Sequence, residues 1–203
     1  MKTNAREARR EAIEIAAIEV LEEKGYEGLS MLGVAKQAKA SNETLYRWYG
    51  DKKGLFKSLV LRNADQIRVY LDDQQERHAT ATQTLENLGP VLLSMLFSNR
   101  AIALNRAAAA DASGELGSAL AMMGRNFISP RITELIHHAR KETGFLAKLP
   151  PASMDEFYFS ILIGDLQVRC VTHALAPLSD EIIAARAEWA WLIFLTMSSP
   201  PKP

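Results

Sequence analysis

Three potential helix caps, Ser30, Ser41 and Asp51, restrict how the residues between them can fold. A hydroxyl or carboxylate just before a helix accepts a hydrogen bond from one of the first unpaired backbone N–H groups, so each of these side chains marks a helix start. Their spacing predicts short helices over residues 31–38 and 42–49, with a turn of about three residues between them. Two short helices joined in this way have helix-turn-helix spacing.

The rest of the sequence also has helical character. Alanine and leucine are frequent, and no segment alternates apolar and polar residues as a strand would. We therefore expect an all-α fold of about nine helices, with a three-helix head over residues 1–51, a larger helical bundle over 52–198 and a flexible tail over 199–203. Besides the two short helices, the expected helices span residues 4–24, 52–77, 81–98, 101–111, 114–143, 154–175 and 180–197.

Glycine and proline predict where these helices end or bend. Gly25 is expected to stop the first helix. Gly89 and Pro90 are expected to kink the helix that contains them, and Pro130 is expected to bend or split its own. Gly33 lies inside a short helix, where it costs up to about 1 kcal/mol relative to alanine, and this choice indicates close approach of a neighbouring helix or of DNA.

The charge of the chain is balanced overall but not locally. Its 203 residues include 24 basic and 24 acidic side chains, and the resulting net charge of zero argues against a protein that simply coats nucleic acid. From Lys36 to Lys57, however, six residues are basic and two are acidic, which leaves an excess of four positive charges. A DNA footprint needs only a few well-placed cations, so we expect it in this segment.

Several sequence features bear on the compartment. A single cysteine, Cys170, excludes an intrachain disulfide and fits a reducing environment. The first residues mix charges throughout and lack the apolar run of a signal peptide. No apolar stretch approaches the roughly 18 to 20 residues that span a bilayer. We expect a cytoplasmic protein with no membrane association, no metal site and no cofactor.

The segment from Gly25 to Phe56 resembles the DNA-binding head of the tetracycline-repressor (TetR) family. The resemblance rests on Gly25-Tyr26, Leu29-Ser30, Val34-Ala35, Ala38, Ala40-Ser41, Thr44-Leu45-Tyr46, Trp48-Tyr49 and Lys52, which occur in this order. It implies a homodimeric, effector-responsive transcriptional repressor that binds a pseudo-palindromic operator in double-stranded DNA. With the local charge, it implicates as DNA-binding residues Ser30, Lys39, Ser41, Asn42, Glu43, Thr44, Tyr46, Arg47, Trp48, Lys52 and Lys53.

The helix over 42–49 is the expected recognition helix, whose N-terminal residues would meet base edges in the major groove. Asn42 can pair with adenine, and Glu43 either accepts from cytosine or only caps and solubilises the helix. The resemblance assigns a phosphate contact to Lys52, where the amine and a helix N-terminus would both favour an anion.

Other positions of this helix and of the turn before it have different expected roles. Leu45 and Tyr49 fall on the inward face and are expected in the core, whereas Trp48 suits either packing or a contact with the DNA backbone. Lys39 occupies the turn between the two short helices, where the family usually has glycine. If Lys39 adopts a positive φ, the strain is about 1 kcal/mol, and its amine gains a position near phosphate.

The resemblance also implies that the C-terminal region binds an effector and forms the dimer. The helices over 154–175 and 180–197 are apolar on more than one face, which favours a four-helix dimer interface built from them. An effector that contacts the helix over 52–77 would alter the spacing of the two recognition helices. Candidate residues for binding a largely apolar effector, each also compatible with an ordinary structural role, are Met95, Leu96, Leu104, Arg106, Met122, Met123, Asn126, Phe127 and Phe159.

Two other classes of protein remain open. An all-α enzyme would carry a catalytic or phosphate-binding motif, and the sequence has none. Cys170 and His173 share a helix face, but a buried cysteine beside a structural histidine explains them better than a nucleophile and its base, so we expect no enzymatic activity. The second alternative is a dimeric helical binding module without DNA binding, against which the retained Thr44, Tyr46 and Lys52 argue.

Overall fold

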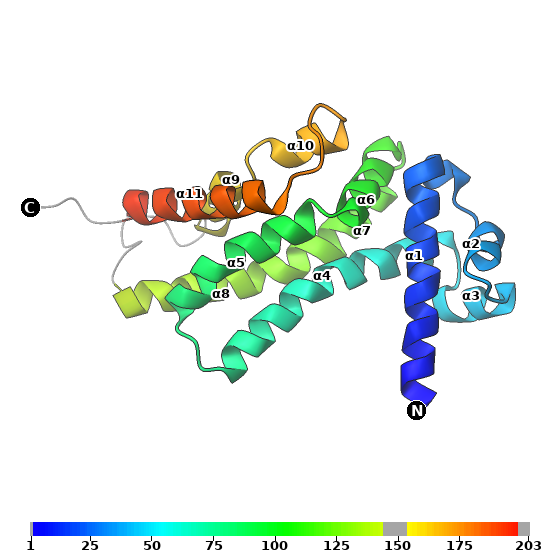
Figure 1. Cartoon of the computed structure of the whole chain (residues 1–203), viewed down its shortest axis with the longest axis horizontal. Helices are drawn as coiled ribbons and strands as arrows, with labels where there is room; N and C mark the ends of the chain where they lie inside the picture. Colours follow the sequence, from blue (N-terminus) through cyan, green and yellow to red (C-terminus); the bar gives the residue numbers. More distant parts are fainter. Residues whose placement is uncertain (1, 144–153, 199–203) are drawn as a thin grey trace, which may run out of the picture. The chain divides into compact units, whose positions relative to one another are not determined.

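The computed structural model describes residues 2–143 and 154–198, and this part of the chain contains helices and no strand, which confirms the all-α prediction (Figure 1). The helices are α1 (Lys2–Gly28), α2 (Met31–Gln37), α3 (Asn42–Tyr49), α4 (Lys52–Glu76), α5 (Ala81–Leu96), α6 (Asn99–Ala110), α7 (Glu115–Leu120), α8 (Asn126–Thr143), α9 (Met154–Ile163), α10 (Leu166–Val171) and α11 (Asp180–Ser198), with a π-helical turn, η1 (Ala121–Arg125), between α7 and α8. None of the described helices is both long and apolar enough to cross a membrane.

Packing divides the described residues into two units. The first lies within Met1–Asn63 and Asn99–Gly124 and contains α1, α2, α3, the start of α4, α6 and α7. In this unit α1 packs against α2 and α6, and α2 packs against α3. Its core includes the fully buried side chains of Ile13, Leu29, Leu45, Leu55, Phe56 and Leu59. This shared core orients the outer face of α3, while the domain boundary expected near residue 51 stays a prediction.

The second unit lies within Ala64–Ser98 and Arg125–Pro203. Here α5 packs against α8 and α11, and α9 packs against α11 (Figure 1). A Cβ atom on Gly89 would lie 3.3 Å from the Cβ of Ala187 and 3.6 Å from the Cδ1 of Leu162. Gly89 therefore permits close packing of neighbouring helices, and α5 continues through Pro90.

The long helix expected over 114–143 is divided upstream of Pro130. α7 ends at Leu120, η1 follows, and α8 begins at Asn126. A proline has no N–H group, and its ring clashes with the carbonyl four residues earlier, which here belongs to Asn126. The disturbance therefore falls about one turn before the proline, in agreement with the expected split, and the π-helical turn accommodates it.

Glycine changes two other expected boundaries. The helix expected over 154–175 is interrupted at Gly164, whose φ of 54° lies in the left-handed region that glycine adopts easily. Gly25 has φ 64° and ψ −175°, so the regular part of α1 stops where the sequence predicted, although a further turn continues to Gly28. Two of the expected helices are therefore divided within the described residues.

Candidate nucleic-acid interface

All three predicted caps are present. The Ser30 hydroxyl accepts the N–H of Gly33 at 3.1 Å, and the Ser41 hydroxyl accepts the N–H of Thr44 at 3.1 Å. The Oγ of Ser41 also lies 2.8 Å from the Oγ1 of Thr44. The Asp51 carboxylate accepts the backbone N–H three residues further on at 2.7 Å. These bonds fix where α2, α3 and α4 begin and hence the spacing of the helix-turn-helix.

Two glycines make these helix starts possible. A Cβ atom on Gly33 would lie 2.9 Å from the Ser30 hydroxyl oxygen, so the close neighbour is the cap itself rather than another helix. A Cβ atom on Gly54 would lie 1.9 Å from the backbone oxygen of Tyr49, which cannot move without displacing the end of α3. Gly54 therefore allows α4 to start directly against the recognition helix.

The turn between α2 and α3 contains a lysine with a left-handed backbone, the conformation considered for Lys39 above. Lys39 adopts φ 50°, in the left-handed region. The N–H of Ala40 donates to the Ala35 carbonyl at 2.9 Å and the N–H of Lys39 donates to the Lys36 carbonyl at 3.3 Å, which is the bonding pattern of a Schellman helix end. The Lys39 carbonyl accepts a hydrogen bond from the Arg9 guanidinium on α1 at 2.9 Å. A lysine thus stands where this motif usually has glycine, with its side chain exposed.

The helix α3 buries one face and exposes another. Leu45 and Tyr49 are 0% and 8% exposed, which confirms that they belong to the core. Asn42 and Glu43 are exposed at the N-terminus of α3, and Tyr46 is 50% exposed on the next turn. The residues expected to read bases are therefore accessible, and α2, α3 and the start of α4 bring together all the predicted DNA-binding residues.

The cations of this surface differ in their partners. The guanidinium of Arg47 lies 3.8 Å from the carboxylate of Glu43, four residues earlier on α3. The amine of Lys53 forms an ion pair with Glu115 on α7, and the hydrogen bond in this pair raises the pKa of Lys53. The amine of Lys52 lies 4.0 Å from the centre of the Tyr26 ring, a cation–π contact that leaves its charge uncompensated.

A buried carboxylate lies beneath this surface. Glu14 on α1 is 1% exposed, and its oxygens lie 3.3 Å from Arg10 and 3.7 Å from Arg62. Burial raises the pKa of Glu14, and the two arginines oppose this shift. Because Arg62 belongs to α4, the cluster ties α1 to the helix that starts at the DNA-binding surface.

The predicted effector-binding residues of the first unit occupy different environments. Met122 and Met123 line a groove of about 450 Å³ together with Phe56. Leu104 is 1% exposed and belongs to the core of this unit, while Arg106 is half-buried.

The remaining candidates lie in the second unit. Met95 is buried and Leu96 is half-buried, whereas Phe127 is 45% exposed. Asn126 lines a groove of about 750 Å³ on α8, and the ring of Phe159 lies 5.5 Å from the guanidinium carbon of Arg125. In neither unit do all the candidates line the same groove, so the effector site stays a prediction.

Sequence reasoning missed several residues that shape this interface. Arg9 and Lys39 are 30 positions apart, and Lys53 and Glu115 are farther apart still, so no local pattern announces either contact. Gly54 did carry a signal, because a glycine three residues after a capping aspartate is an unusual choice inside a helix.

Known proteins share this arrangement. Residues 15–59 match the model of the bacterial regulatory proteins of the tetR family. A TetR transcriptional regulator from Agrobacterium tumefaciens is 27% identical, with a TM-score of 0.71 over 96% of each chain. A TetR-family regulator from Mesorhizobium loti MAFF303099 is 22% identical, with a TM-score of 0.74 over 94% of this chain and 96% of that one.

The same fold occurs in the transcriptional regulator FadR from Bacillus subtilis, solved in complex with stearoyl-CoA. That chain is 17% identical, with a TM-score of 0.73 over 92% of this chain and 98% of its own length. No curated protein matches the sequence. The matched proteins are transcriptional regulators rather than enzymes, and the matched residues 15–59 contain the caps and the recognition helix described above. Residues 15–59 of the chain therefore match the bacterial regulatory proteins of the tetR family, and the chain has the fold of TetR-family transcriptional regulators.

Proposed function

We propose that the protein is a repressor that binds a pseudo-palindromic operator as a homodimer and leaves it when a small, largely apolar effector binds. The observation that carries this proposal is the exposed N-terminus of α3, where Asn42 and Glu43 are accessible while Lys52 at the start of α4 keeps its charge uncompensated. Asn42 pairs with adenine and Glu43 accepts from cytosine. The phosphate backbone is contacted by Ser30, Lys39, Ser41, Thr44, Tyr46, Arg47, Trp48, Lys52 and Lys53.

The test is DNA binding by the full-length protein. A duplex of about 30 base pairs, selected from random-sequence DNA on the immobilised protein, offers three turns of groove for two half-sites. Lys52→Ala should weaken binding to every sequence and reduce the salt slope by about one for each phosphate that the protein no longer neutralises. Asn42→Ala should instead change which bases are preferred. Absence of binding to any duplex at low salt would favour a helical module without DNA binding.

The dimer is proposed to form through α11 and its neighbour α9. Ile182, Ala185, Trp189 and Leu192 are exposed and recur at intervals of three and four residues, so they form one apolar stripe along α11. Such a stripe suits a two-fold interface in which the same helix from each protomer packs against its copy. Trp189 carries the guanidinium of Arg186 4.6 Å from its ring centre, which orients the indole.

Sedimentation velocity tests this interface. Leu192→Glu places a charge in the stripe and should convert a dimer into a monomer, whereas Ala184→Glu, which adds the same charge at an exposed position of α11 outside the stripe, should leave the dimer intact. A wild-type protein that sediments as a monomer at micromolar concentration would contradict the proposal.

The groove lined by Phe56, Met122 and Met123 is the proposed entry point for effector action. Methionine side chains adapt to varied apolar shapes, and Lys53 and Glu115 also line this groove. A ligand that strengthens this ion pair would hold Lys53 against α7 and withdraw it from DNA at the start of α4, next to the recognition helix. Stearoyl-CoA is the first probe, because FadR from Bacillus subtilis binds it in the same fold.

Anisotropy of the labelled operator tests release. An effector that couples to DNA binding should weaken operator affinity by about 5- to 150-fold at saturation, which corresponds to about 1–3 kcal/mol. Met123→Arg should abolish this response while leaving effector-free DNA binding in place. A ligand that binds the protein but leaves operator affinity unchanged would contradict the release mechanism.

A further inference from the structure

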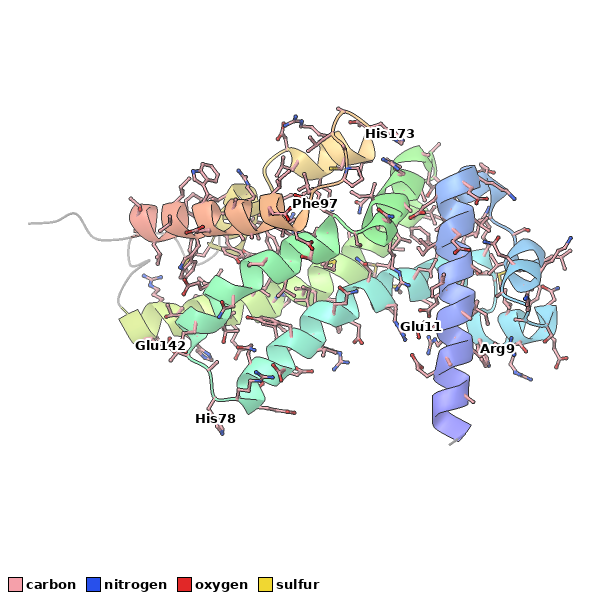
Figure 2. The ribbon with its side chains drawn as sticks, in the orientation of Figure 1. Arg9, Glu11, His78, Phe97, Glu142 and His173 are labelled. Carbon is pink, nitrogen blue, oxygen red and sulfur yellow. The ribbon has the colours of Figure 1, made fainter. Side chains whose placement is uncertain are left out.

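Two arginines on the first turns of α1 face the helix-turn-helix. The Arg9 guanidinium donates to the Lys39 carbonyl at 2.9 Å, and the guanidinium carbon of Arg6 lies 5.7 Å from the centre of the Trp48 ring. Residues three apart on a helix share a face, so both side chains leave α1 on the same side. Figure 2 shows Arg9 on the side of α1 that faces α2 and α3.

Two carboxylates close to these arginines on α1 have other partners. Glu7 pairs with Arg62, and Glu14 pairs with Arg10 and Arg62. Within the described part of the chain, no carboxylate lies within 4 Å of the guanidinium of Arg6 or of Arg9, and both side chains are exposed. The helix is therefore neutralised on the side of α4 and carries uncompensated positive charge on the side of α3.

Both guanidinium groups also keep donors available. A guanidinium has five N–H donors, of which Arg9 uses one on the Lys39 carbonyl, while Arg6 lies over the Trp48 ring and has no hydrogen bond to another described residue. Trp48 lies in the last turn of α3, away from the N-terminal residues that read bases. The available donors therefore lie beside the C-terminal end of α3, where we expect contacts with the DNA backbone rather than with bases.

We propose that Arg6 and Arg9 bind operator phosphates and extend the DNA-binding surface from the helix-turn-helix onto α1. The inference rests on the proposed DNA binding. The forked guanidinium matches a phosphate in a two-point contact, which makes arginine well suited to this position. Arg9 also holds the strained Lys39 turn, so it is a positioning residue as well as a phosphate ligand.

The experiment must separate these two roles. Arg9→Gln removes the charge and, because its amide lies two atoms closer to the backbone, also the bond to the Lys39 carbonyl, whereas Arg9→Lys keeps the charge. Arg6→Gln removes the second charge. Lys24→Gln is the matched control, because Lys24 is an exposed cation on the same helix, 15 residues and therefore about 22 Å along the axis from Arg9.

The readout is the slope of the logarithm of the association constant against the logarithm of salt concentration, measured by anisotropy on the selected duplex. Removing one phosphate contact from each protomer removes two from the dimer and flattens the slope by about 1.8. The affinity ratio between 50 and 200 mM salt should then shrink by about 12-fold for Arg6→Gln and for Arg9→Gln. Arg9→Lys and Lys24→Gln should keep the wild-type slope, and all four variants should retain the wild-type circular dichroism spectrum.

The possible failures are distinguishable. If the wild type binds with a steep salt slope and both glutamine variants keep that slope, Arg6 and Arg9 are structural and this inference is overturned while the proposed function stands. If the wild type binds no duplex at low salt, the proposed function fails and the inference fails with it.

Discussion

Replacing Lys39 with glycine should change stability and DNA affinity in opposite directions. Lys39 has φ 50°, and a left-handed residue other than glycine costs roughly 1–2 kcal/mol. Glycine removes this strain but loses about 0.5–1 kcal/mol through the greater freedom of the unfolded chain. The net gain in the free energy of unfolding should be up to about 1.5 kcal/mol, which is a rise in Tm of up to roughly 6 °C for a chain of this size.

The same substitution removes an exposed cation beside the recognition helix. If Lys39 contacts phosphate, its removal from both protomers should flatten the salt slope of operator binding by about 1.8. Differential scanning calorimetry at one fixed protein concentration gives the stability change, since the Tm of a dimer depends on concentration. Fluorescence anisotropy across salt concentrations gives the change in DNA binding.

Two further variants at this position separate strain from charge. Lys39→Asn also relieves the backbone, because asparagine tolerates the left-handed region, so it should give part of the stability gain. Since asparagine carries no charge, it should give the whole change in salt slope. Lys39→Arg keeps strain and charge and should alter neither stability nor salt slope. A fall in Tm for Lys39→Gly would refute the strain argument, and an unchanged salt slope would refute the phosphate contact.

Three other substitutions test the helix starts and the buried carboxylate. Gly54→Ala should destabilise by at least about 3 kcal/mol in urea denaturation, because its Cβ would lie 1.9 Å from a backbone oxygen, whereas Gly117→Ala, which meets nothing within 4 Å, should be neutral or gain up to about 1 kcal/mol. Ser41→Ala should cost about 1 kcal/mol because the α3 cap is removed, and an unchanged urea midpoint would contradict that role. Glu14 has a pKa raised above its ordinary 4.5, so the native state holds the proton more tightly than the unfolded state. Wild-type stability should therefore fall as pH rises from 4.5 through the raised pKa of Glu14. Glu14→Gln should remove this component and become progressively more stable relative to the wild type from about pH 4.5 upward; a constant difference across pH would contradict the raised pKa.

The parts of the interface set by neighbouring residues could be predicted from the sequence. The hydroxyls of Ser30 and Ser41 bond N–H groups three residues away, and the burial of Leu45 and Tyr49 follows from helical periodicity within one short helix. A positive φ at Lys39, which was considered because the family usually has glycine in this turn, is present at 50°.

The parts set by contacts between distant segments could not be predicted. Nothing near Gly89 in the sequence indicates Ala187, so the local pattern could not predict the close packing of helices that the structure has there. The interruption at Gly164 was missed because the flanking residues are apolar at helical spacing on both sides. The candidate effector residues were chosen for their side chains alone, and several of them, such as Leu104, fill the core of a unit instead of a groove.

The zero net charge of the chain hides how its cations are distributed. Arg10 and Arg62 both pair with the buried Glu14. Neither is available to DNA, because turning away would leave Glu14 without a partner in an apolar core. Arg47 is different: its pair with Glu43 is 62% and 86% exposed, and such pairs contribute little, so phosphate can replace the carboxylate at small cost.

Lys53 is in an exposed ion pair like Arg47, but its partner lies on another helix, as for Arg62. Its pair with Glu115 is also exposed, but Glu115 belongs to α7 and the pair lines the methionine groove. A phosphate that takes Lys53 must release Glu115, and any ligand that strengthens the pair must withdraw Lys53 from DNA. The two binding events therefore compete for one amine, and the competition is reciprocal, because the free energy that couples two ligands is the same whichever binds first. Glu115→Gln should consequently raise operator affinity in the absence of effector and reduce the effector response, both measured by the same anisotropy titration; operator affinity equal to that of the wild type would exclude competition for Lys53.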